Sequence, residues 1–167
     1  MHKPFYYLFD EDEYKHFIKQ VMKQFRGSEE YSIWRNSRDR DKCAATGMTN
    51  YDNGIQIEVH HYGKTLWDWV EYILNFFYLE DLPLNSFYIC LILNELHSND
   101  CISYVPLTHC IHKMLHTDYR ATVAQYPDIL SSIHPENMAL SDKIIKNYVN
   151  LLKVILKEED LLSNEAV

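Results

Sequence analysis

Apolar residues recur at helical spacing over most of this chain. Between positions 10 and 27 they fall three and four residues apart, with Asp10 at the N-cap position and Gly27 where a helix would stop. The third predicted helix opens with Thr65, a good capping residue, and has an acidic residue three positions later. The same periodicity predicts the remaining long helices over 28–36, 65–80, 86–97 and 141–160.

Two short segments instead follow the period of two that is typical of β-strands. A hairpin-type Asn-Gly turn at 53–54 precedes the first, in which apolar and polar residues alternate over 55–60. The second predicted strand, CISYVPL, covers 101–107. Thr108 can then cap a helix that runs over 108–116.

Composition supports one folded domain. The 167 residues are 47% hydrophobic, which is enough to bury a core without disulfides or a metal. The N-terminus resembles no secretory signal, and no apolar run is long enough to cross a bilayer, so a cytoplasmic protein without membrane association is expected. The cysteines form no CxxC pair and are expected to be reduced and mostly buried: Cys43, Cys90, Cys101 and Cys110.

Charge restricts the classes of partner. The formal net charge of −8 argues against nucleic-acid binding through bulk electrostatics. A local basic segment, WRNSRDRDK at 34–42, remains, although two aspartates dilute it.

One stretch, YVPLTHCIHKMLH at 104–116, is dense in histidine. His109, His112 and His116 are spaced by three and four residues, so a helix would carry them on one face. Such a stripe is either a polar surface or a set of metal ligands. Two histidines four apart offer two imidazoles from a rigid base, and a third ligand from a neighbouring strand end would leave an open coordination position, as in catalytic zinc sites.

The segments IQIEVHHYG and NDCISYVPLTHCIHKMLH together resemble the HNH endonucleases, the ββα-metal nucleases. The resemblance covers residues 35–120 or so and implies an α+β fold. A small ββα-metal core with a helical insertion would lie between N-terminal helices over 1–34 and a C-terminal helical region over 121–167. The chain departs from the family at Ser103, where relatives carry asparagine, and it lacks their CxxC structural-zinc pairs.

This resemblance implies a metal-dependent endonuclease that hydrolyses DNA phosphodiester bonds, encoded by a phage and acting in the cytoplasm of the bacterial host. His61 would be the general base that activates water. His60, His112 and His116 would hold a divalent ion, which could be Mg, Mn, Ni or Zn. The implied contacts to DNA phosphates fall to five basic residues, Arg35, Arg38, Arg40, Lys113 and Arg120.

Other interpretations remain open. A catalytically decayed HNH scaffold could be a binding or regulatory protein with a protein or nucleic-acid partner, and the chain could form a homodimer. The histidines could also hold a purely structural zinc ion. Glu58 shares a strand face with His60, so it is either a residue that orients a ligand or an ordinary surface carboxylate.

Overall fold

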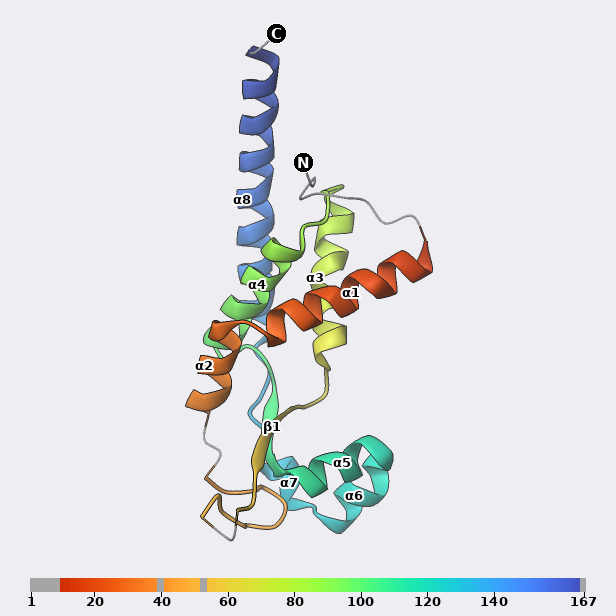
Figure 1. Cartoon of the computed structure of the whole chain (residues 1–167), viewed down its shortest axis with the longest axis vertical. Coiled ribbons are helices and arrows are strands. Elements are labelled where there is room, and N and C mark those ends of the chain that lie inside the picture. The colour runs from red at the N-terminus through yellow and green to blue at the C-terminus, as the bar shows by residue number, and fades with distance from the viewer. Residues whose placement is uncertain (1–9, 39–40, 52–53, 166–167) are drawn as a thin grey trace.

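The computed structural model describes residues 10–38, 41–51 and 54–165, which form eight helices and one two-stranded antiparallel sheet (Figure 1). The expected α+β class is therefore confirmed in a mostly helical form. The helices are α1 (Glu11–Arg26), α2 (Glu29–Ser37), α3 (Leu66–Leu79), α4 (Ser86–Ser98), α5 (His109–Thr117), α6 (Tyr119–Gln125), α7 (Asp128–Ser131) and α8 (Met138–Glu165). The strands are β1 (Ile57–His61) and β2 (Tyr104–Thr108).

Four long helices form the larger part of the molecule. α1 crosses α3 and α4, and the first half of α8 packs against the same two helices while its second half extends beyond them (Figure 1). None of the helices in the described part of the chain has the length and apolar content of a bilayer span. The apolar stripes of these helices face one another, and each large side chain buried there contributes about 1.5–3 kcal/mol. The largest buried aromatic residues are Phe17, Phe25, Trp69 and Phe77.

The predicted cap of α3 forms a complete capping box. Thr65 Oγ1 accepts a hydrogen bond from the Asp68 backbone N–H at 3.2 Å, and the Asp68 carboxylate accepts one from the Thr65 N–H at 2.6 Å. We expect Thr65→Ala to lower the free energy of unfolding by about 1 kcal/mol, because a backbone donor loses its partner. Urea denaturation of this variant beside Thr65→Ser, which keeps the acceptor, measures the effect. Equal stability of the two variants would contradict it.

The sheet and α5 form the smaller part of the molecule, at the opposite end from the C-terminus (Figure 1). Ile57 pairs with Thr108 and His61 with Tyr104, and α5 follows β2 without a loop. A separate and much smaller apolar cluster holds this part together, so it has less burial to stabilise it than the helices have. Its buried members are Cys43, Ile57, Val105, Leu107, Ile111, Leu115 and Ile129.

Some local predictions differ from the structure. The segments that form α6 and α7 are seven and four residues long, too short for a helical period to be recognised. Thr108 occupies the N-cap position of α5 but makes no side-chain capping bond; it is buried, and its backbone N–H donates to Cys43 Sγ at 3.2 Å. Position 53 of the predicted turn lies outside the described residues. The expected division of the chain into a core over 35–120 and flanking helical regions over 1–34 and 121–167 stays a prediction.

Candidate metal centre

Three histidines from two elements converge on one point. His60 lies near the end of β1, and His112 and His116 lie one turn apart on α5. One imidazole nitrogen from each lies within 4.8 Å of the other two, and the Nε2 atoms of His112 and His116 are 3.0 Å apart. The ring centre of His60 is 4.7 Å from that of His112 and 5.1 Å from that of His116. The structure therefore brings together all three expected metal ligands.

Local geometry explains this convergence. Successive side chains of a strand point to opposite faces, so His60 faces α5 while His61 faces away from it. Residues four positions apart on a helix share one face, which places His112 and His116 side by side. α5 packs against both strands, so that face lies over the end of β1.

Glu58 orients His112, one of the three converging histidines, by bonding the ring nitrogen that faces away from the shared point. Its carboxylate accepts one hydrogen bond from His112 Nδ1 at 2.5 Å and another from His109 Nδ1 at 2.8 Å. Burial would raise the pKa of the Glu58 carboxyl, but the bonds from His112 and His109 outweigh that effect and lower the pKa. Because Nδ1 of His112 carries its proton toward Glu58, its Nε2 is directed to the point shared with His116.

His60 has the protonation state that a metal requires. Burial, and after it the neighbouring His112 and His116, lower its pKa to about 4. At neutral pH the imidazole of His60 is therefore uncharged, and no proton has to leave before its nitrogen can bind an ion.

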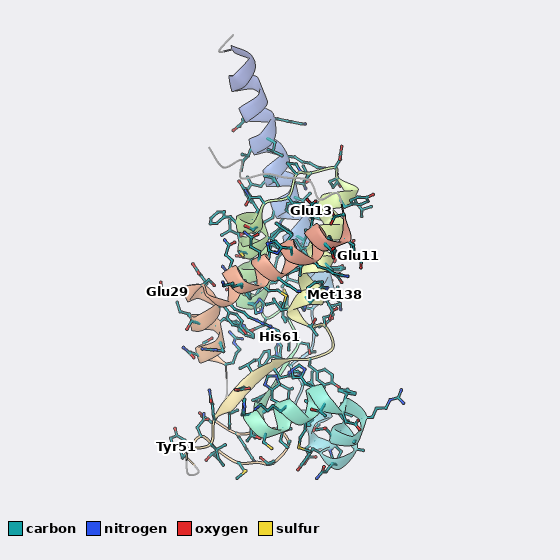
Figure 2. The ribbon with its side chains drawn as sticks, turned by 45° about the vertical axis from the view of Figure 1, so that its right-hand side comes forward. Glu11, Glu13, Glu29, Tyr51, His61 and Met138 are labelled. Atoms are coloured by element: carbon teal, nitrogen blue, oxygen red, sulfur yellow. The ribbon has the colours of Figure 1, made fainter. Side chains whose placement is uncertain are left out.

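His61, the expected general base, belongs to a different environment. It lies between the helices and the strand (Figure 2), and its ring is stacked 5.8 Å from Trp34. Its Nε2 is 3.0 Å from Nε2 of the buried His97, whose Nδ1 bonds the Leu93 carbonyl at 2.6 Å. A carbonyl cannot donate, so His97 carries its proton on Nδ1 and His61 donates from Nε2. Burial, then His97 and Arg26, lower the pKa of His61 to about 3, which makes it a poor base.

A pocket of about 450 Å³ opens beside the cluster. Its walls come from α1, α2, β1, the start of α3 and α5, and the three converging histidines line it. Arg26 and Arg35 also line the pocket, and within the described ranges neither forms an ion pair. Sequence reasoning identified Arg35 but missed Arg26, because only the turn between α1 and α2 brings the two together.

The other residues expected to contact DNA phosphates do not gather here. Arg38 forms an ion pair with Asp100 and lies over the ring of Trp34, 5.4 Å from its centre. Lys113 and Arg120 are exposed and do not line the pocket, and position 40 lies outside the described residues. Of the expected phosphate contacts that the structure describes, Arg35 alone lines this pocket.

Comparison with known proteins identifies a phage family. A family model described as Bacteriophage G278-like virion protein matches residues 3–164, whereas no curated protein and no solved structure matches the chain.

The expectation of a DNA-cleaving HNH endonuclease is wrong, because the match covers nearly the whole chain and describes a virion protein. It gives no support to the HNH resemblance or to a decayed HNH scaffold, although the expected phage connection is confirmed. The catalytic role expected of His61 depended on that endonuclease function, so it loses its basis. The physical reason lies in its position, because its proton is directed to His97 in the core and its pKa is far below neutral.

Proposed function

Since the chain belongs to the Bacteriophage G278-like virion protein family, we propose that it is a structural component of the phage particle whose three-histidine cluster binds one zinc ion. The observation that carries the metal site is the convergence of His60, His112 and His116. Its place of action in this proposal is the particle rather than the host cytoplasm.

The donor set supports zinc over the alternatives considered from the sequence. Imidazole nitrogen suits zinc and nickel, whereas magnesium and manganese prefer oxygen ligands. Two nitrogens that each lie about 2.0–2.1 Å from a tetrahedral zinc are about 3.3 Å from one another. The 3.0 Å separation in the His112–His116 pair is close to that value, so only a small adjustment would be needed to admit the ion.

A structural role for the ion fits the surroundings of the cluster. The ligands come from β1 and α5, and both elements belong to the part of the molecule with the smaller apolar core. A metal bond between them adds stability where burial supplies least, because the free energy of binding to a folded site adds to the free energy of folding.

The contact from Glu58 supports a specific expectation. We expect Glu58→Ala to weaken zinc affinity by roughly 10–100-fold, because His112 loses the carboxylate that fixes its orientation and basicity. Calorimetric titration of the purified protein with zinc measures this loss. Glu136→Ala is a matched control, since Glu136 pairs with Lys64 and does not line the pocket. Equal affinity of the Glu58 variant and wild type would contradict the orienting role.

The virion role is tested on purified particles of the phage that encodes this chain. Mass spectrometry of washed particles should detect the chain as a constant constituent, and elemental analysis should detect zinc that survives dialysis. A chain found in the infected lysate but lost from purified particles would contradict the proposal. DNA and a second copy of the chain, the partners expected from the sequence, stay predictions.

A further inference from the structure

The cluster supplies three ligands, and zinc usually takes four. Because His60, His112 and His116 all line the pocket, the open position of a bound ion faces the interior of that pocket. Glu58 lines it too, but each of its carboxylate oxygens already accepts a hydrogen bond from a histidine. Among the described residues of the pocket wall, no free carboxylate remains to complete the coordination.

Two arginines stand at the same pocket. Arg26 ends α1 and Arg35 lies in the last turn of α2, and the ring of Tyr31 lies close to both. Burial raises the pKa of the Tyr31 hydroxyl, while the positive charges of Arg26 and Arg35 act against that rise. Among the described residues Arg26 and Arg35 form no ion pair, and the pocket wall offers one carboxylate, that of Glu58. With a divalent ion bound, the pocket would be locally positive in a chain of net charge −8.

We infer that a carboxylate from another polypeptide of the particle enters this pocket and completes the zinc coordination, with Arg26 and Arg35 binding its remaining oxygen lone pairs. The inference rests on the proposed metal function. Carboxylate oxygen is an established fourth partner of histidine at zinc, and guanidinium groups bind carboxylates through short, charge-assisted hydrogen bonds. The metal would then join this chain to its neighbour as well as β1 to α5.

The charge of the whole chain favours a carboxylate over a nucleic acid. A polyanion approaches with many phosphates at once, and the net charge of −8 on the whole chain opposes that approach. A single acidic side chain or C-terminus on a protein segment brings its charge only to the positive pocket. The exposed lysines of α8, including Lys143 and Lys146, lie on an element that contributes nothing to the pocket wall.

Cobalt-loaded full-length protein provides the test, because cobalt(II) accepts imidazole ligands and its visible absorption changes when a ligand is exchanged. The probes are a blocked hexapeptide rich in glutamate, the same peptide with glutamine in place of glutamate, inorganic phosphate and duplex DNA. We expect a saturable spectral change with the glutamate peptide and little change with the others. Arg26→Gln plus Arg35→Gln should weaken the peptide response at least tenfold while cobalt affinity is retained. Lys143→Gln plus Lys146→Gln, which alters net charge equally, should leave the response unchanged.

Each other outcome of the cobalt titration contradicts the inference and identifies the step that is wrong. Protein that binds cobalt but responds equally to both peptides has no carboxylate site, and the metal function alone survives. A stronger response to phosphate or DNA would identify a phosphate ligand and overturn the choice of a carboxylate. If the arginine and lysine double variants lose the response to the glutamate peptide equally, the peptide is attracted by the overall charge of the chain and not by Arg26 and Arg35, which contradicts the inference. Failure to bind cobalt or zinc at all overturns both this inference and the proposed metal function.

Discussion

Zinc at a thousandfold excess over its dissociation constant is expected to raise the melting temperature of the protein by about 10 °C, and His112→Ala is expected to abolish most of that rise. Such an excess of a ligand that binds only the folded state adds about 4 kcal/mol, and each kcal/mol moves the midpoint of a chain of this size by roughly 2–4 °C. His112 is chosen for the substitution because it is the one of the three ligands whose ring bonds Glu58.

The matched control lies on the same helix. His109→Ala should keep most of the zinc-induced rise, because His109 is not part of the three-histidine cluster and its ring bonds the other oxygen of Glu58. Differential scanning calorimetry with and without zinc measures all three proteins. An equal rise for wild type and His112→Ala would mean that zinc binds elsewhere.

Acid should destabilise the protein through the buried His97. Burial lowers the pKa of His97 in the folded protein to about 4, whereas a histidine in an unfolded chain titrates near 6.5. The unfolded state therefore binds more protons below pH 6.5, so the stabilising contribution of the neutral ring is present above that pH and is lost as the pH falls toward 4. We expect His97 to account for a loss of about 2–3 kcal/mol in unfolding free energy between pH 7 and pH 4.5.

Urea denaturation across this pH range measures the slope. His97→Gln cannot take up a proton and should flatten the dependence, whatever its stability at pH 7. His16→Gln is the control, since His16 is exposed on α1 and its ring stays in water whether the chain is folded or not. A slope unchanged by His97→Gln would show that the buried ring is not the group that titrates.

Periodicity and capping residues predicted most of the helices and both strands. The stripe and caps of α1, the capping box of α3 and the alternation that defines β1 are local features, and each is found where the pattern indicated. Elements too short to show a helical period were missed, namely α6 and α7. The buried position of Thr108 was also missed, because it depends on the distant Cys43.

The site residues were predicted less completely than the helices and strands. Strand alternation and the i, i+4 rule explain why His60, His112 and His116 meet, but it was the resemblance to a nuclease that identified His60 as a ligand. The same rules place His61 on the opposite face of the strand, so a regular strand cannot direct both histidines at one metal ion. Arg26 could not be found from the sequence, because its place at the pocket depends on the angle between α1 and α2. An arrangement of ligands like that of a nuclease does not determine which reaction, if any, a protein catalyses. Here the family match replaced the expected endonuclease function with that of a virion protein.

X-ray absorption at the zinc edge, on protein loaded with one equivalent of zinc and dialysed, tests the central claim most directly. We expect one retained zinc per chain, with three imidazole nitrogens at about 2.0–2.1 Å, and loss of the retained metal in His112→Ala. Retention of no zinc, or a shell dominated by sulfur at about 2.3 Å from the cysteines, would contradict it.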